Sequence, residues 1–362
     1  MEPSGATMRT LSILLLLIAL VGCEKHKPVE KRAFDFETLM GKELPAWKHV
    51  QTPEDFQNLA LFKEVYEKNI ALLDQPSVDT KIPQVIHFIW MGPRPFPRES
   101  IENVRTWHAH HPDWKIKFWT DRTRPLPHPS MELCYIKDFE FTKLAPFFAQ
   151  SDNYGEKSDI LRYEILNQEG GVYVDHDVKC FKSFAPFHTQ YDLFCGLEVP
   201  YATTLSSSIW PTNNVVGAKA GHPMMGKVID WLSVHWDQIE KDYPGKDRDS
   251  VINRVSHRTF LVLGEIFRAN NNLLGNVDIA FPSYYFNAPK EEWALFSQHQ
   301  YKGTWFENES VFEKKVRKRL MMLSKKANKM LLAVSILAGL MTIGFAIMGF
   351  LFTRAVRQIR RG

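Results

Sequence analysis

Cysteine is scarce in this sequence: four residues in 362, with no closely spaced pair. This argues against a disulfide framework and against a structural zinc site, because both need cysteines in regular sets. Internal repeats and low-complexity segments are absent too. With 44% hydrophobic and 24% charged residues, the composition is that of an ordinary globular protein. The three cysteines after Cys23 are expected to be reduced thiols that pack as small hydrophobic side chains.

Acidic residues are missing from the C-terminal segment, residues 314–362, which contains twelve Lys or Arg. The rest of the chain has 33 basic and 41 acidic residues, so its net charge is −8. Proteins that bind nucleic acid place clustered basic side chains on the folded domain. The acidic body therefore argues against nucleic acid as a partner.

Long apolar runs occur only near the two ends of the chain. Residues 11–22 form the first run, which is short for a helix that must cross a hydrocarbon core of about 30 Å. It ends at Cys23 in a sequence that resembles the lipobox of bacterial lipoproteins. Residues 1–23 are therefore expected to be a signal or lipobox-like segment, with a signal anchor as the alternative. The second run predicts a transmembrane helix over 331–353, between a basic juxtamembrane segment, 313–330, and a basic tail, 354–362.

The membrane orientation of the body is left open by two conflicting signals. Eight Lys or Arg precede the second apolar run and four follow it, which favours a body on the cytoplasmic side. An acylated Cys23 would instead export the body. We therefore expect a single-pass membrane protein, with a cytoplasm-facing body as the first hypothesis and an exported lipoprotein as the alternative.

The body between these ends divides into a charged preface, residues 24–81, and one larger domain, residues 82–312. An amphipathic stretch over 53–73 predicts a helix in the preface. In the larger domain, residues 85–90 predict a buried strand, 101–110 a helix and 115–119 a second strand. This order is typical of a βαβ unit, and hence of an α/β fold with a parallel, helix-covered sheet.

Residues 158–178 are the most informative segment of the body. Ser158 can cap a helix that runs to Gln168, and Gly170 with Gly171 can end that helix in the left-handed conformation. A short strand over 172–174 should follow, with an Asp-His-Asp sequence at its end. Open α/β sheets bind their ligands at the carboxyl ends of strands.

Asp175 and Asp177 stand two positions apart at this strand end. Because side chains i and i+2 of a strand share a face, both carboxylates can face one divalent cation, which takes oxygen ligands. A second Asp-x-Asp, formed by Asp247 and Asp249, lies in a polar stretch and is expected to be a solvated loop.

Five stretches of the body carry further motifs in a fixed order: IPQVIHFIW at 82–90, SDILRY at 158–163, GGVYVDHDV at 170–178, NNVVGA at 213–218 with GHP at 221–223, and HQYKGTW at 299–305. Together they resemble the family 32 glycosyltransferases, which are sugar transferases with an Asp-x-Asp motif. That family includes fungal mannosyltransferases and is distantly related to the large clostridial glucosylating toxins.

The resemblance implies a GT-A fold and transfer of a hexose from a nucleotide-sugar donor with retention at the anomeric carbon. It implies that Mn²⁺ or Mg²⁺ is bound at Asp177 and Asp175, with His299 as a candidate metal or phosphate ligand. The implied catalytic residues are Asp159, Arg162, Asp175 and Asp177. The implied donor-binding residues are Trp90 (stacked on the base), Asp159, Arg162, Asp175, Asn213, Thr304 and Trp305.

Chemistry agrees with these implied roles. A metal ion neutralises the charge that develops on a diphosphate leaving group. The guanidinium of Arg162 suits phosphate oxygens because it forks onto them and stays charged. Asp159 lies one helical turn away on the same face.

The sequence departs from the family at several positions. Gln300 replaces the second His of the closing motif, which leaves the far-side metal ligand open, and Thr304 replaces a Ser. Residues 258–264 lack the family's Gly-Pro, so the acceptor side is poorly defined.

The function expected from these features is a membrane-attached transferase that extends a glycan or glycolipid, with GDP-mannose or a UDP-hexose as donor. Mannose is the first expectation for the sugar. One alternative is a toxin-like enzyme that glycosylates a partner protein. Another is a non-catalytic surface lipoprotein that binds carbohydrate, which would be expected to have lost the metal ligands, although Asp175 and Asp177 are present.

Overall fold

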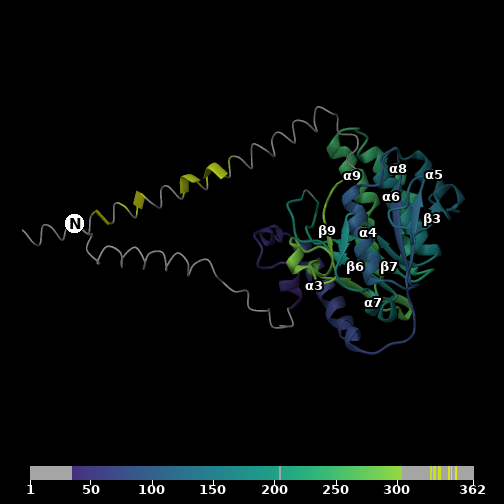
Figure 1. The fold of residues 1–362 in the computed structure, drawn as a ribbon, viewed down its shortest axis with the longest axis horizontal. Helices are drawn as coiled ribbons and strands as arrows, with labels where there is room; N and C mark the ends of the chain where they lie inside the picture. Colours follow the sequence, from purple (N-terminus) through teal and green to yellow (C-terminus); the bar gives the residue numbers. More distant parts are fainter. Residues whose placement is uncertain are drawn as a thin grey trace, which may run out of the picture.

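A seven-stranded mixed sheet with helices packed against it forms the centre of the molecule (Figure 1). The structure is a computed structural model that describes residues 35–203 and 205–303, with separate helical positions between 327 and 348. The strands follow the order β3-β2-β1-β4-β7-β6-β8 across the sheet. Their bounds are Val85–Trp90 (β1), Lys115–Thr120 (β2), Glu132–Tyr135 (β3), Gly171–Val174 (β4), Leu193–Leu197 (β6), Pro211–Ala218 (β7) and Asp278–Phe281 (β8).

A second, two-stranded antiparallel sheet joins β5 and β9 beside the carboxyl end of β4. Its strands are Val178–Cys180 and Ser297–His299. The α-helices are Phe36–Leu39 (α2), Pro53–Asn69 (α3), Arg98–His110 (α4), Ala145–Gln150 (α5), Tyr154–Gln168 (α6), Ala185–Gln190 (α7), Pro223–Asp242 (α8), Arg248–Arg258 (α9) and Phe260–Asn270 (α10). Short 3₁₀ turns are Pro45–His49, Ile70–Asp74, Ile136–Asp138, Leu273–Gly275, Ser283–Tyr285 and Glu291–Trp293.

The βαβ unit expected from the sequence is confirmed. β1 and β2 pair in parallel over their whole length, with α4 between them in the chain. β4 joins the other side of β1, again in parallel. β7 then runs antiparallel between β4 and β6. This reversal places the start of β7 at the same edge of the sheet as the end of β4.

The helix before β4 begins earlier than the sequence indicated. Asn153, rather than Ser158, is its N-cap, and the Asn153 side chain accepts hydrogen bonds from the backbone of Gly155 at 2.8 Å and Glu156 at 3.1 Å. Asn caps helices as well as Ser does, so the capping signal alone could not choose between them. The expected left-handed ending is confirmed, because φ is +67° at Gly170 and +99° at Gly171.

The segment around the second Asp-x-Asp is also more ordered than expected. It was predicted to be a solvated loop, but Asp247 is the N-cap of α9 and accepts a hydrogen bond from the backbone of Ser250 at 3.0 Å. Its side chain is nevertheless exposed, as expected for a solvated residue. The local reason is that Asp is a strong capping residue.

The preface packs on the sheet and shares its hydrophobic core. α3 begins at Pro53, as the amphipathic pattern predicted, and lies against β8. Asp55 also ties α3 to the segment before β7, because its carboxylate accepts hydrogen bonds from the backbone of Ser208 at 2.6 Å and the hydroxyl of Ser207 at 2.8 Å. Phe36 and Phe62 are buried in the same cluster as the strands.

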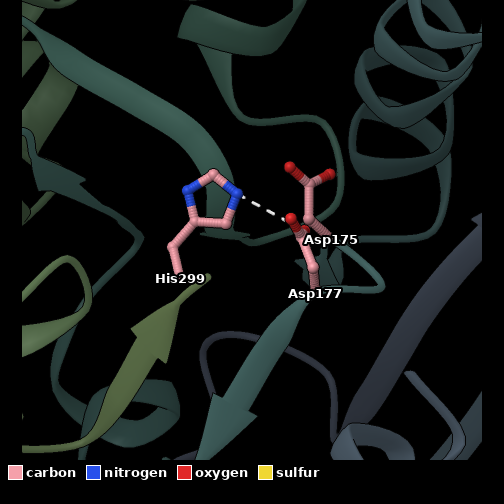
Figure 2. Close-up of side chains that lie close together, drawn as sticks. All are labelled: Asp175, Asp177 and His299. Atoms are coloured by element: carbon pink, nitrogen blue, oxygen red, sulfur yellow. Dashed lines mark ion pairs between the residues drawn. The ribbon is translucent and has the colours of Figure 1, made fainter. Parts of the chain in front are cut away.

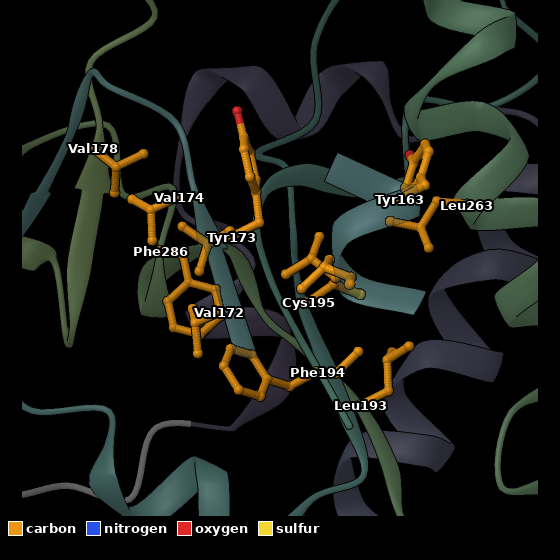
Figure 3. Packing of buried hydrophobic residues seen from close by; sticks show 14 of the residues in the cluster. Tyr163, Val172, Tyr173, Val174, Val178, Leu193, Phe194, Cys195, Leu263 and Phe286 are labelled. Atoms are coloured by element: carbon orange, nitrogen blue, oxygen red, sulfur yellow. The ribbon is translucent and has the colours of Figure 1, made fainter. Parts of the chain in front are cut away.

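The centre of the core lies between β4, β6 and the helices that cover them. Side chains of β4 and β6, including Val172, Val174 and Phe194, pack with Phe286 in Figure 3. The thiols of Cys180 and Cys195 are free and buried, as expected for small hydrophobic side chains, whereas Cys134 is half-buried. Dense packing of this kind holds the strand ends, and hence the site, in place.

The predicted terminal segments lie almost entirely outside the described residues. This applies to the signal or lipobox-like segment, 1–23, and to the juxtamembrane, transmembrane and tail segments between 313 and 362. Among the residues that are described, no helix has both the length and the apolar character needed to cross a membrane. The membrane span remains a prediction from the sequence.

Candidate active site

A pocket of about 390 Å³ opens at the edge of the sheet where β1 and β4 end and β7 begins. Trp90 is the last residue of β1, and Asp175 directly follows β4. Asn213 lies near the start of β7, and the Asn214 carbonyl accepts a hydrogen bond from the backbone N–H of Asp175 at 2.8 Å. Residues distant in the chain thus meet in one cavity because neighbouring strands end at the same edge.

Asp175, Asp177 and His299 form a cluster that could hold a metal ion (Figure 2). One potential ligand atom of each lies within 4.8 Å of the others, and Asp177 Oδ1 is 3.3 Å from His299 Nε2. The β5–β9 pairing brings His299 here, because it pairs with Val178, the residue after Asp177. The family resemblance implied these three residues, and the fold places them together.

Electrostatics keeps Asp177 ionised. Burial opposes its charge, but the charge and hydrogen bond of His299 outweigh burial, so the pKa of Asp177 is lowered. The backbone N–H of Lys302 also donates to the Asp177 carboxylate, at 2.7 Å. Burial would lower the pKa of His299, but the charge of Asp177 reverses the effect and raises it.

Two carboxylates and an imidazole are a donor set that suits Mn²⁺ or Mg²⁺, since such ions accept oxygen ligands and complete their shells with water or phosphate. The imidazole nitrogen that faces the carboxylates is Nε2, whereas Nδ1 is buried on the other side of the ring (Figure 2). The types of ligand atom and their separation of no more than 4.8 Å therefore fit a divalent cation.

Arg162 sits at the centre of a second charged cluster beside the first. Its Nη2 atom lies 2.5 Å from Asp159 Oδ1 and 3.2 Å from Asp175 Oδ1, and its Nη1 atom donates to the carbonyl of Asn213 at 2.5 Å. The guanidinium also lies 4.1 Å from the centre of the Tyr173 ring. The i, i+3 spacing of Asp159 and Arg162 on α6 produces this geometry.

Burial and the attraction between opposite charges together set the pKa values of Asp159 and Arg162. Burial raises the pKa of Asp159 to about 7, although the positive charge of Arg162 acts in the opposite direction. For Arg162, burial works against the charge, but Asp159 and Asp175 outweigh it and raise the pKa. The Asn213 side chain donates to Asp159 at 3.1 Å. One guanidinium thus balances two carboxylates in a largely buried place.

Trp90 lines the pocket but is mostly covered by protein. Its side chain is packed edge-on against His176 and Phe96, with ring centres 4.9 and 5.6 Å away, and its Nε1–H donates to the carbonyl of Arg94 at 2.9 Å. The strand-end position is as predicted. Stacking on a nucleotide base remains a prediction.

The closing motif is described only in part. Thr304 and Trp305, the other predicted donor-binding residues, lie outside the described residues. Gln300, which replaces a family histidine, points to Asn103, and the two amides lie 3.3 to 3.4 Å apart. Its backbone N–H donates to the carbonyl of Asp177 at 2.9 Å. In this arrangement the Gln300 side chain is engaged away from the cluster of Asp175, Asp177 and His299.

Sequence reasoning missed one side of the pocket. Glu198, Tyr201 and Tyr301 line it, together with α9 and the start of α10. Burial raises the pKa of Glu198 and of Tyr201. A signal for Glu198 was available, since it follows the apolar strand 193–197 just as Asp175 follows its own strand. Tyr301 stands inside the closing motif at 299–305, but the resemblance assigned it no role, and no signal marked Tyr201.

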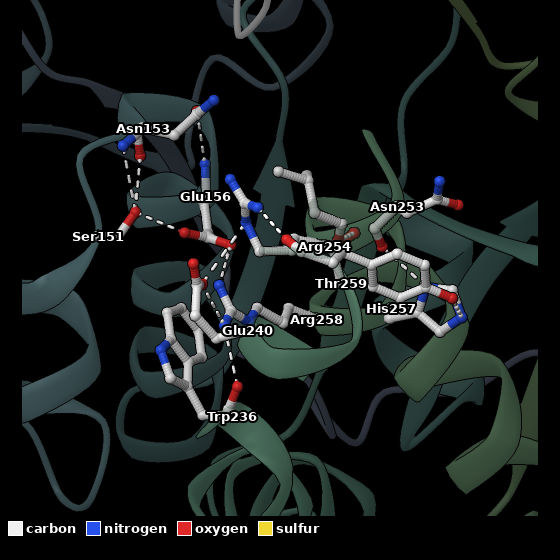
Figure 4. A network of polar contacts seen from close by, with 12 residues as sticks. Ser151, Asn153, Glu156, Trp236, Glu240, Asn253, Arg254, His257, Arg258 and Thr259 are labelled. Carbon is white, nitrogen blue, oxygen red and sulfur yellow. Dashed lines mark hydrogen bonds and ion pairs between the residues drawn. The ribbon is translucent and has the colours of Figure 1, made fainter. Parts of the chain in front are cut away.

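A buried ionic network supports the pocket from behind (Figure 4). Arg258, at the end of α9, contacts Glu156 of α6 and Glu240 of α8, each at 2.9 Å, and its guanidinium lies 3.7 Å from the Trp236 ring centre. Ser151 donates to the Glu156 carboxylate at 2.6 Å. The network joins the helix that carries Asp159 and Arg162 to the helix that forms the missed wall.

Comparison with known proteins agrees with the motifs. Residues 97–194 match the family model described as "Glycosyltransferase sugar-binding region containing DXD motif". "Subversion of eukaryotic traffic protein A" of Legionella pneumophila is 28% identical over 48% of this chain and 28% of its own length. "Inositol phosphoceramide mannosyltransferase 3" of Schizosaccharomyces pombe is 28% identical over 41% of this chain and 36% of its own length. The chain thus spans about a third of the length of these relatives.

Among solved structures, the catalytic domain of the α-toxin from Clostridium novyi is similar over 85% of this chain and 96% of its own, with 12% identity and a TM-score of 0.40. The family model and the mixed, mostly parallel sheet together agree with the expected α/β fold of GT-A type. The resemblance drawn from the motifs is confirmed, because residues 97–194 match the DXD glycosyltransferase model and a mannosyltransferase is among the similar proteins.

Proposed function

We propose that this chain is a metal-dependent transferase that moves a hexose from a nucleotide-sugar donor to a glycan or glycolipid acceptor, with retention at the anomeric carbon. The observation that carries the proposal is the meeting of Asp175, Asp177 and His299 with the Asp159–Arg162 pair in one pocket. A divalent cation held by the first three residues would supply positive charge to the leaving diphosphate.

The residues of the chain have distinct tasks in this proposal. Arg162 is held by three oxygen atoms, so its guanidinium is already oriented before a diphosphate or sugar arrives. Asp159 and Asn213 offer hydrogen bonds to the donor sugar. During transfer the bond from the anomeric carbon to the diphosphate breaks, a bond to the acceptor oxygen forms, and the hydroxyl proton is released.

Mannose is our first proposal for the sugar. It is supported by the name of the S. pombe relative, and by a Saccharomyces cerevisiae relative named "Mannosyl phosphorylinositol ceramide synthase SUR1", which is 29% identical over 46% of this chain. A lipid-linked acceptor at a membrane would also agree with the apolar run at 331–353. Transfer to a partner protein, the toxin-like alternative drawn from the sequence, is the second candidate.

Nucleotide release by the purified full-length chain tests the proposal. With Mn²⁺ and a panel of GDP- and UDP-sugars, we expect one donor to be hydrolysed. The Asp177→Asn variant or a chelator should reduce the rate at least a hundredfold, because the carboxylate that would hold the cation is lost.

Asp247→Asn is the matched control, since it changes the other Asp-x-Asp at an exposed position and keeps a good helix cap. This variant should retain the wild-type rate. If the wild-type chain neither binds nor hydrolyses any donor, the proposal is wrong. Label transferred to protein rather than to lipid or glycan would favour the second candidate.

A further inference from the structure

Glu198 lies at the end of the pocket that the donor-binding residues leave free. It directly follows β6, and its backbone N–H donates to the carbonyl of Trp210 at 3.2 Å. The Leu197 carbonyl before it accepts a hydrogen bond from the side chain of the buried Asn287 at 3.0 Å. The carboxylate is therefore presented by a fixed strand end and not by a free loop.

The sheet order arranges the pocket residues in a row. β1, β4, β7 and β6 are consecutive neighbours, and the residues at this edge are Trp90, Asp175, Asn213 and Glu198 respectively. A donor with its base at Trp90 and its sugar near Asn213 would occupy the first three positions. The fourth position is then the place where an acceptor approaches the donor sugar.

Among the described residues, no Lys or Arg forms an ion pair with the carboxylate of Glu198, whereas Arg162 pairs with Asp159. Within the part of the chain that the structure describes, its charged neighbour is His299, and its hydrogen-bonding neighbour is the hydroxyl of Tyr301. A carboxylate withdrawn from water needs hydrogen-bond donors to offset the cost of desolvation. Hydroxyl groups of a substrate supply such donors.

Tyr301 has an unusual backbone conformation, which allows this segment to contact both Asp177 and Glu198. Its φ is +51°, in the left-handed region that is sterically unfavourable for an aromatic residue. This turn lets the next residue, Lys302, donate its backbone N–H to Asp177. It also sets the Tyr301 ring 4.2 Å from the ring of His299, with its hydroxyl toward Glu198. Strain of this kind persists where a site requires it.

We propose that Glu198 is an acceptor-binding residue, whose carboxylate, oriented by Tyr301, receives a hydrogen bond from the hydroxyl group that attacks the donor sugar. The proposal rests on the glycosyl transfer proposed above and extends it to the acceptor side. It identifies this end of the pocket as the place where an acceptor hydroxyl binds. The pocket is also lined by the apolar side chains of Ile252 and Phe260.

Donor hydrolysis by the full-length chain tests this role, because water then takes the place of the acceptor hydroxyl. For Glu198→Gln we expect kcat to fall at least tenfold, while the donor KM and the Kd of the nucleoside diphosphate with Mn²⁺ change less than twofold. Tyr301→Phe should show the same pattern to a smaller extent. Glu292→Gln, at an exposed carboxylate, is the matched control and should leave all three constants unchanged.

Two outcomes would overturn the assignment. A raised donor KM with an unchanged kcat would place Glu198 on the donor sugar, and unchanged constants would remove it from the reaction. A wild-type chain that turns over no donor contradicts the proposed function itself, and this inference with it. The wild-type measurement therefore separates the two failures, and thermal melting of each variant shows whether it has folded.

Discussion

Arg162 is the residue through which the charges of the pocket are balanced. Its two terminal nitrogens reach Asp159, Asp175 and the carbonyl of Asn213, so the guanidinium is committed to a fixed plane. A buried charge held by several partners has little freedom to rearrange when substrate enters. Its value for binding a diphosphate lies in this preorganisation.

Replacing Arg162 by Lys should therefore damage activity although the charge is kept. An ammonium cannot reach three acceptors in a plane, so we expect donor hydrolysis to fall at least tenfold, and nucleotide affinity with it. Calorimetry and steady-state rates measure both effects. Arg105→Lys, at an exposed position on α4, is the control and should behave as wild type. Retained activity in Arg162→Lys would show that charge alone suffices.

The residues on one side of the pocket were predicted from the sequence, and those on the other side were not. Asp159, Arg162, Asp175, Asp177 and His299 were inferred from motifs, and the fold brings them together. The residues Glu198, Tyr201 and Tyr301 were not inferred, because their meeting depends on the lateral order of the strands. That order is set by long-range packing, and no local pattern in the chain encodes it.

At the scale of elements, the turn between α6 and β4 decides whether Asp175 reaches the pocket. Gly171 has φ +99°, and a Cβ atom there would lie 2.6 Å from the Val85 carbonyl and 2.8 Å from His87 Nε2. The strand can pair with β1 only if no side chain stands at this point. Glycine is therefore required for both its conformation and its size.

Gly171→Ala should destabilise the protein by several kcal/mol, since strain and backbone overlap add. Gly221→Ala is the informative comparison. Gly221 has φ +68°, but a Cβ atom there would meet nothing within 4 Å, so only the conformational cost of roughly 1 kcal/mol remains. Urea unfolding of the two variants gives the difference. Equal losses of stability would show that the close contacts at Gly171 are relieved by small shifts.

Local signals predicted the elements that are continuous in the chain. The strand over 85–90 is as predicted, and the glycine ending of α6 is also confirmed. The antiparallel β7 was not predicted, and the N-cap of α6 was placed five residues too late, at Ser158 rather than Asn153. Strand direction depends on partners far along the chain, and Asn153 and Ser158 carry equal capping signals.

At the scale of the whole molecule, buried neutral histidines link stability to pH. Nδ1 of His87 accepts from the Trp119 indole while its Nε2–H donates to the carbonyl of Gly170. His111 donates through Nδ1 and accepts the backbone N–H of Phe184 at Nε2. If either ring were protonated, the nitrogen that now accepts a hydrogen bond would carry a proton and face the N–H of Trp119 or Phe184, so that hydrogen bond would be lost. Burial accordingly lowers the pKa of His87 to about 3 and that of His111 to about 4.

The sign of the pH dependence follows directly. Between about pH 6.5 and 4 the unfolded chain binds protons at these two positions and the folded chain does not, so stability falls as pH falls. Each histidine contributes up to about 1.4 kcal/mol per pH unit. Burial lowers the pKa of His176 and His188 as well, which adds to the effect. Asp159 and Glu198, whose pKa values burial raises, act in the opposite direction in this range, and His299 does so above about pH 6.5. We expect the urea midpoint to be clearly lower at pH 5 than at pH 7.5.

Single variants isolate the effect. His111→Gln should reduce the slope of stability against pH, while His110→Gln, at a half-buried position, should change it much less. A midpoint that is the same at both pH values would mean that the interior accommodates the charged histidines.

Because the preface packs on β8, the part of the chain that folds around one core differs from the part that matches the family model. The stretch that matches the family model, residues 97–194, is much smaller than the part of the chain that shares one hydrophobic core, which includes Phe36. A fragment limited to residues 97–194 would expose apolar surfaces that are buried in the whole domain. Each large side chain that becomes exposed would lose about 1.5–3 kcal/mol of stabilisation from burial. Divergence in the preface can therefore change the heat resistance of such proteins while the choice of sugar stays the same.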